Sequence, residues 1–134
     1  MKLYADEPGH RAVRALELVV VSSLARVEVP AALWRKRRRG ELHEAELRVL
    51  VTEFEADYFG SPGEAPRFLV TGLPPNVLDA AVRLLASHAL RAYDAIQLAS
   101  ACSVRDADPG CAAFACADRG LRAAAEAEGF EVLP

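Results

Sequence analysis

The sequence of 134 residues predicts an α/β domain in which helices flank a mainly parallel sheet. Its short apolar runs do not alternate with polar residues, which is typical of strands covered on both faces in parallel sheets. Helical stretches separate these runs, so strand and helix alternate along the chain. Because no repeat, linker or low-complexity tract divides the chain, we interpret residues 1–134 as a single domain.

Two of the predicted strands, at residues 18–21 and 68–71, bracket the first two predicted helices. Ser22 or Ser23 is suited to cap a helix over residues 24–39, which Gly40 then ends. A second helix is predicted over residues 41–58 because it carries an apolar stripe at helical spacing. The members of this stripe are Leu47, Leu50, Phe54 and Tyr58.

The second half of the chain repeats this alternation. A third helix opens at Pro74-Pro75-Asn76, where Asn76 and Asp79 are spaced like a capping box. Its predicted apolar face consists of Val77, Ala81, Leu84 and His88. A helix of small residues over 92–104 and a last helix over 118–128 follow, and predicted strands lie at residues 112–117 and 130–133.

Composition narrows the class of protein. A net charge of −3 excludes a strongly basic nucleic-acid binder, although it permits a local basic patch. Hydrophobic residues make up 52% of the chain, which argues against disorder. The three cysteines form no Cys-x-x-Cys pair, and no signal-like or membrane-length apolar segment is present, so we expect a cytoplasmic protein. The common nucleotide-binding and hydrolase motifs are missing as well.

Three acidic residues, Glu28, Asp94 and Asp118, are candidates for chemistry, and each also has a structural interpretation. Asp118 directly follows an apolar run, and its position alone favours the N-cap of the next helix. Glu28 has no basic residue three or four positions away, so it needs a distant partner, a metal or solvent, unless it serves the dipole of its helix. Asp94 is suited to a cap or a first-turn position, paired with Arg91.

Considered together, the three acids suggest a shared site. All three lie near the starts of predicted helices, and the carboxyl ends of parallel strands share one edge of a sheet. Glu28, Asp94 and Asp118 are therefore able to converge at that edge. Clustered carboxylates repel one another unless a cation lies among them, and hard oxygen ligands favour Mg²⁺ or Mn²⁺.

One basic cluster stands out, at residues 35–39. The cluster is able to contact phosphates or an acidic partner. It also lies in the last turn of a predicted helix, where cations complement the dipole, and we favour this solvated interpretation. Trp34 and Tyr93 are interpreted as core or interface anchors rather than as platforms for base stacking.

Three segments, at residues 22–29, 93–99 and 114–121, resemble the PIN-domain ribonucleases, and most of all the VapC-type toxins of bacterial toxin–antitoxin pairs. They read Ser-Ser-Leu-Ala-Arg-Val-Glu-Val, Tyr-Asp-Ala-Ile-Gln-Leu-Ala and Phe-Ala-Cys-Ala-Asp-Arg-Gly-Leu. Each motif is weak alone, but their order, spacing and flanks also match. The resemblance extends from Lys2 to Pro134.

The resemblance implies a three-layer α/β/α PIN-like fold and a metal-dependent endoribonuclease that hydrolyses RNA phosphodiester bonds. In such proteins a quartet of acids holds Mg²⁺ or Mn²⁺, and Glu28, Asp94 and Asp118 match three of the four. It further implies the toxin role in a type II toxin–antitoxin system, a VapB-like antitoxin, an RNA substrate and a homodimer, with no membrane partner. The alternative is a degenerate, non-catalytic PIN module that dimerises or binds an antitoxin.

The beginning of the chain departs from the family pattern. The family's first acid ends an opening strand in an Asp-x-Ser motif, and the helix that follows ends in a sequence like the one at residues 2–9 here. We therefore expect the N-terminal strand and its Asp to be absent from this sequence. Asp6 is rejected as a substitute because only 22 residues separate it from Glu28.

Two expectations follow from this departure. In-frame codons upstream of Met1 should encode an apolar run that ends in Asp-x-Ser, and sequencing the DNA there tests this; upstream codons without such a run would show the interpretation to be wrong. The family's opening strand is central in its sheet, so its absence would leave neighbouring strands unpaired on one side. We therefore also expect the 134-residue chain to be unstable alone, unless another segment occupies the place of that strand.

Overall fold

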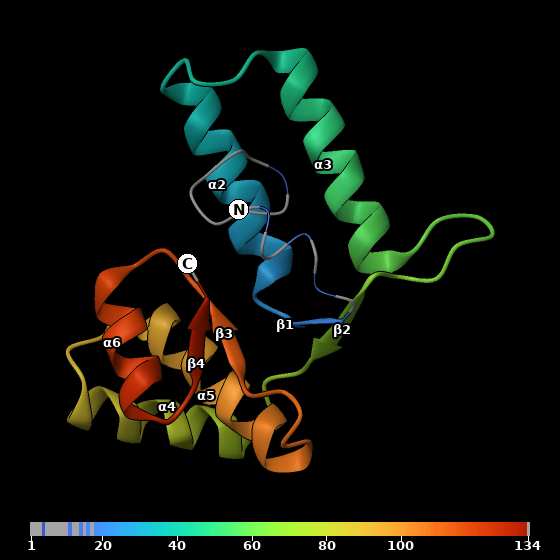
Figure 1. Cartoon of the computed structure of the whole chain (residues 1–134). Helices are drawn as coiled ribbons and strands as arrows, with labels where there is room; N and C mark the ends of the chain where they lie inside the picture. The colour runs from blue at the N-terminus through green and yellow to red at the C-terminus, as the bar shows by residue number, and fades with distance from the viewer. Residues whose placement is uncertain (1–3, 5–10, 12–13, 15, 17, 134) are drawn as a thin grey trace.

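The structure, a computed structural model, describes Tyr4, Arg11, Arg14, Leu16 and residues 18–133 (Figure 1). Strands and helices alternate along these residues as the sequence predicts. The elements in chain order are β1 (Val19–Ser22), α2 (Ala25–Arg38), α3 (Glu44–Phe59), β2 (Phe68–Thr71), α4 (Pro75–Ser87), α5 (Ala92–Ala107), β3 (Ala113–Ala115), α6 (Arg119–Ala127) and β4 (Glu131–Leu133).

Two predicted helix starts differ from the observed ones. Leu24, rather than Ser22 or Ser23, occupies the N-cap of α2, and the Ser22 hydroxyl accepts the Leu24 N–H in the turn before it. The predicted capping box of Asn76 and Asp79 is wrong, because α4 begins at Pro75 after an N-cap at Pro74. Proline favours the first helical position, where no backbone N–H is needed, and so sets the start one residue before Asn76.

The strands form two separate parallel pairs within the described residues. β1 pairs with β2 in a register that runs from Val19 opposite Phe68 to Ser22 opposite Thr71. β3 pairs with β4, with Phe114 opposite Val132. The fold is thus α/β with parallel strands, but the prediction of one sheet is corrected, since no described strand joins the two pairs.

The separation of the pairs also leaves the strands less covered than the apolar runs predicted. All of β1 is only half-buried, and Leu69 in β2 is 57% exposed. A continuous apolar run predicts coverage on both faces, but that coverage needs neighbouring layers on each side. With only two described strands in each sheet, part of this apolar surface stays accessible.

Each half of the molecule has its own group of buried side chains. Phe54 of α3 contacts the rings of Tyr58 and Phe68 and anchors the half formed by α2, α3, β1 and β2. The other half, formed by α4, α5, α6, β3 and β4, contains the larger core. Its buried members are Val77, Ala81, Leu84, Ala95, Leu98, Ala99, Leu121, Ala124, Ala125 and Phe130.

The predicted apolar face of α4 is confirmed for Val77, Ala81 and Leu84. His88 is instead the C-cap residue of α4, and its Nε2 lies 2.8 Å from Glu128 Oε1. This contact ties the end of α4 to the end of α6. Figure 1 shows the two halves as separate groups of helices, linked by the chain between β2 and α4.

Truncation of Leu98 to alanine should lower the free energy of unfolding by about 2–5 kcal/mol, because its fully buried side chain would leave a cavity. Val82, which is 66% exposed on α4, provides the matched control, and Val82→Ala should have a much smaller effect. Urea unfolding followed by circular dichroism measures both. Equal losses in the two variants would contradict the assigned core.

Candidate functional site

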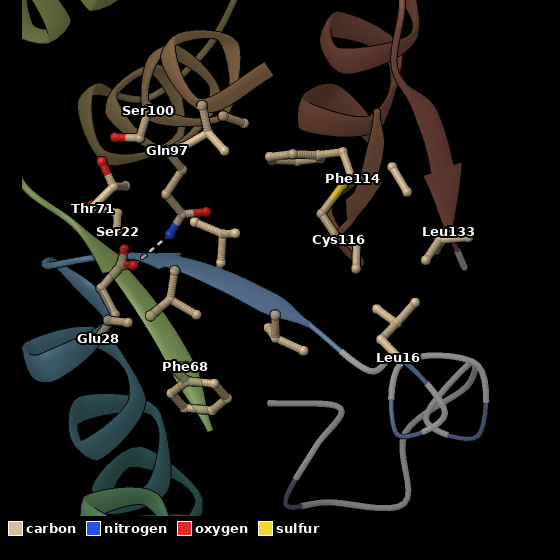
Figure 2. A pocket seen from close by; sticks show the side chains of 18 of the residues that line it. Leu16, Ser22, Glu28, Phe68, Thr71, Gln97, Ser100, Phe114, Cys116 and Leu133 are labelled. Atoms are coloured by element: carbon tan, nitrogen blue, oxygen red, sulfur yellow. Dashed lines mark hydrogen bonds between the residues drawn. The ribbon is translucent and has the colours of Figure 1, made fainter. Parts of the chain in front are cut away.

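A cavity of about 720 Å³ lies between the two halves. β1, one face of α2, part of α5 and the segment around β3 surround it, and most of its lining is apolar. Polar side chains gather where β1 and β2 end, namely Ser22, Thr71, Glu28 and Gln97 (Figure 2). The carboxyl ends of the strands are where the sequence places its candidate acids.

Glu28 lies in the first turn of α2 and is bound from the other half of the molecule. The side-chain amide of Gln97, on α5, donates a hydrogen bond to Glu28 Oε2 (Figure 2). Burial raises the pKa of the Glu28 carboxyl, the hydrogen bond from Gln97 lowers it, and the charge of Asp94 raises it, with burial the largest effect. The distant partner that Glu28 needs is therefore an amide rather than a cationic side chain.

Asp94 lies in the first turn of α5, one turn before Gln97 on the same helix face. Burial raises the pKa of its carboxyl, and the negative charge of Asp118 raises it further. The charge of Arg91 and a backbone hydrogen bond at Arg91 lower this pKa by less. The charge of Arg91 thus favours the ionised form of Asp94, while a pairing of the two side chains stays a prediction.

Asp118 is the N-cap residue of α6, as its position predicted. Its Oδ1 accepts a hydrogen bond of 3.0 Å from the backbone N–H of Leu121. This bond orients the carboxylate at the start of the helix, close enough to Asp94 for the two charges to interact. Asp118 itself is exposed and does not line the cavity.

The structure brings the three acids together in pairs. Asp94 is the middle member, since its charge acts on Glu28 and the charge of Asp118 acts on it. Among the described residues, however, no three His, Cys, Asp or Glu side chains lie close enough to hold a metal ion. Gln97 holds Glu28, and the first turn of α6 holds Asp118. Repulsion between the negative charges of the acids opposes a closer approach of their carboxylates.

The donor chemistry of this set nevertheless fits a hard divalent cation. Carboxylate oxygens are the ligands that Mg²⁺ and Mn²⁺ prefer. The raised pKa values of Glu28 and Asp94 mark sites where negative charge is unfavourable, and a cation would remove that penalty.

Sequence reasoning missed the role of Gln97, although Gln97 lies within the second matching segment. The available signal was its spacing of three residues from Asp94, which puts both on one helix face. Ser22 and Thr71 were also missed as lining residues; the signal there was a polar residue at the end of an apolar run. Asp6, with the rest of the segment 5–10, lies outside the described residues.

The basic cluster at residues 35–39 lies in and just after the last turn of α2, as predicted. Glu41 forms ion pairs with Lys36 at 3.4 Å and with Arg39 at 4.0 Å, while Arg35 lines the cavity. Trp34 is 50% exposed and Tyr93 is 57% exposed, so neither is a core anchor. Their role at an interface remains a prediction.

Comparison with known proteins decides the family. No protein-family model matches the chain. Ribonuclease VapC45 and ribonuclease VapC49, from two strains of Mycobacterium tuberculosis (CDC 1551 / Oshkosh and ATCC 25618 / H37Rv), are each 35% identical to it over 138 residues. Each match covers the whole chain and 89% of the relative. The chain belongs to the VapC ribonuclease family.

Membership of the VapC family confirms the resemblance that the three segments indicated, since VapC ribonucleases are PIN-domain toxins. In the part of the chain that the structure describes, no helix is long and apolar enough to cross a membrane.

Replacing Gln97 with alanine should raise the pKa of Glu28 further, because the amide hydrogen bond favours the ionised carboxylate. Carboxyl carbon chemical shifts recorded against pH measure this pKa. A variant of the exposed Asn76, Asn76→Ala, is the control and should leave it unchanged. An unchanged Glu28 pKa in Gln97→Ala would contradict the hydrogen bond.

Asp94→Asn should make the protein more stable at neutral pH in the absence of divalent cations. The folded state binds the Asp94 proton more tightly than the unfolded state, so the free energy of unfolding falls as pH rises from about 3.8 through the raised pKa. The neutral amide removes this penalty, by less than about 1 kcal/mol because the group is partly solvated.

Urea unfolding between pH 3 and 8 with chelator present measures this difference, with Asp79→Asn on exposed α4 surface as control. If Asp94→Asn steepened the loss of stability with rising pH, the assigned electrostatics would be wrong.

Proposed function

We propose that this chain is a metal-dependent endoribonuclease that hydrolyses RNA phosphodiester bonds, and that it is the toxin of a type II toxin–antitoxin system. One observation carries the proposal: in a member of the VapC ribonuclease family, the charge of Asp94 acts on Glu28 and the charge of Asp118 acts on Asp94. Both relatives are named ribonucleases. The proposed architecture is a single three-layer PIN-like domain.

In this proposal the oxygens of Glu28, Asp94 and Asp118 hold Mg²⁺ or Mn²⁺. When bound, the cation supplies Lewis-acid activation of water and neutralises charge at the phosphoryl oxygens. The protein's own task is to hold three carboxylates of like charge near one another. It divides that task between the Gln97 amide, which orients Glu28, and the N–H of Leu121, which orients Asp118.

The helix starts support the same arrangement. Asp94 lies in the first turn of α5 and Asp118 at the N-cap of α6. Unpaired N–H groups at helix starts favour negative charge, so both helix starts suit a carboxylate. The same backbone dipoles attract the phosphate groups of an RNA strand.

The proposed partners are an RNA substrate, a VapB-like antitoxin and a second copy of the chain, in the cytoplasm. Family membership supports this set, and the exposed rings of Trp34 and Tyr93 support a protein interface. Aromatic side chains exposed on one molecule are typical anchors of protein–protein contacts.

A second candidate function is a non-catalytic PIN module that dimerises or binds an antitoxin. The specific observation in its favour is that the described side chains include no metal-sized group of three acidic, histidine or cysteine ligands. The two candidates differ in whether chelators and acid substitutions alter any activity on RNA.

Purified protein should cleave a labelled structured RNA when Mg²⁺ or Mn²⁺ is added, and chelator should abolish cleavage. Asp94→Asn and Asp118→Asn should each lower the rate by at least about a hundredfold, a loss typical for one electrostatic group at a reacting centre. Asparagine is also a good N-cap, so Asp118→Asn removes the charge while keeping the start of α6 intact.

Asp79→Asn serves as the control and should cleave at the normal rate. Cleavage that survives chelator, or that both Asp94→Asn and Asp118→Asn retain, would reject the metal-dependent mechanism. An RNA left intact under every metal condition by folded protein that still binds an antitoxin would favour the non-catalytic module.

A further inference from the structure

One face of α2 carries both a candidate acid and part of the basic cluster. Glu28, Ala32 and Arg35 follow one another at steps of four and three residues, the spacing of neighbours on one helix face, and all three line the cavity. The same spacing leads on to Arg39, whose backbone N–H donates to the carbonyl oxygen of Arg35 at 3.1 Å and so continues the helical path. We call this surface the Glu28–Arg39 face.

The basic cluster also has a side that points away from this face. Arg37 is two residues beyond Arg35, which at about 3.6 residues per turn puts it on the opposite side of the helix. The pKa of Glu44, at the start of α3, is lowered mainly by the hydrogen bond and charge of Arg48, and the charge of Arg37 adds a smaller effect. Arg37 therefore lies on the side of α2 toward the start of α3.

Nearby negative charge balances only part of the cluster. Residues 35–39 carry five positive charges. The dipole of α2 supplies about half a negative charge at this helix end. Glu41 supplies one more and pairs with Lys36 at 3.4 Å and with Arg39 at 4.0 Å. Arg35 forms no ion pair within the part of the chain that the structure describes. The helix-dipole interpretation that the sequence favours thus accounts for a minority of the charge.

The spacing along this face suits a nucleic-acid strand. At about 1.5 Å of rise per residue, Arg35 lies about 10 Å along the helix axis from Glu28, and Arg39 lies about 16 Å from it. A stacked strand advances about 3.4 Å per nucleotide, so these lengths correspond to about three and five nucleotides. Ala32, between Glu28 and Arg35, has a side chain small enough to let a strand pass close to the helix.

We propose that the Glu28–Arg39 face binds a single RNA strand, and that Arg35 and Arg39 hold phosphates about three and five nucleotides from the one at the candidate acids. The planar guanidinium group binds phosphate through two parallel hydrogen bonds, which suits arginine to this task. The inference rests on the proposed function, since it takes RNA as the substrate. Arg35 and Arg39 bind and orient the strand, whereas the chemistry belongs to the acids.

The experiment measures the affinity for a labelled single-stranded RNA by fluorescence anisotropy, with chelator present and at several salt concentrations. The double variant Arg35→Gln/Arg39→Gln should lower the affinity about tenfold at low salt. It should also reduce the slope of log affinity against log salt by about 1.4, because each phosphate contact on a single strand contributes about 0.7. Both side chains are exposed, so the variant should fold, and far-UV circular dichroism checks this.

A second double variant, Arg37→Gln/Arg83→Gln, is the matched control. It removes the same net charge, but Arg37 lies on the opposite face of α2 and Arg83 is exposed on α4. Its affinity for RNA and its salt slope should stay close to those of the unmodified protein. The comparison separates a located binding face from a general effect of charge.

Three results would overturn the proposal. The first is an equal loss of affinity in the two double variants, and the second is an unchanged salt slope in Arg35→Gln/Arg39→Gln. The third is polyglutamate of equal charge that binds as tightly as RNA and loses as much affinity in that variant. An acidic protein segment would then be the partner of this face.

Failure of this inference is distinguishable from failure of the proposed function. RNA that binds as expected but stays intact with Mg²⁺ and Mn²⁺ would reject the ribonuclease and leave the binding face in place. RNA that is cleaved in a metal-dependent way, with the same affinity in every arginine variant, would reject the binding face alone.

Discussion

The hydrogen bond from Gln97 to Glu28 joins the two halves of the molecule at the point where the candidate acids meet. Each half has its own buried side chains, and a mostly apolar cavity lies between the halves. The hydrogen bond therefore lies at one end of a cavity whose lining is otherwise mostly apolar. Because it places Glu28 beside α5, it also brings Glu28 within range of the charge of Asp94. The electrostatic properties of the site depend on how the halves meet.

The three acids are held against their own repulsion by different means. Burial disfavours the charges of Glu28 and Asp94, while an amide, a backbone hydrogen bond and Arg91 favour them. Asp118 is instead fixed by the first turn of α6. Such a set costs stability and keeps negative charge concentrated, which is common where a protein binds a cation. The proposed metal binding uses these same carboxylates, whose mutual repulsion lowers the stability of the fold.

Local patterns in the sequence predicted local structure well. The run at residues 68–71 is β2, the stripe containing Leu47 and Phe54 lies on α3, and Asp118 caps α6. Pairing between strands was predicted less well, because an apolar run indicates burial but does not say which strands are neighbours. The capping box at Asn76 failed since Pro75 has a stronger positional preference. Gln97 was missed because a single amide has no periodicity, and its partner lies 69 residues away in the sequence.

The larger core has a consequence for the order in which the molecule assembles. Its members all lie between Val77 and Phe130, so α4, α5 and α6 form a cooperative unit from contacts that are close in sequence. Asp94 and Asp118 belong to this unit, whereas Glu28 belongs to the other half. The contacts of a single core therefore position two of the three acids. The third, Glu28, depends in addition on how the halves meet, since its hydrogen-bond partner Gln97 lies across the cavity between them.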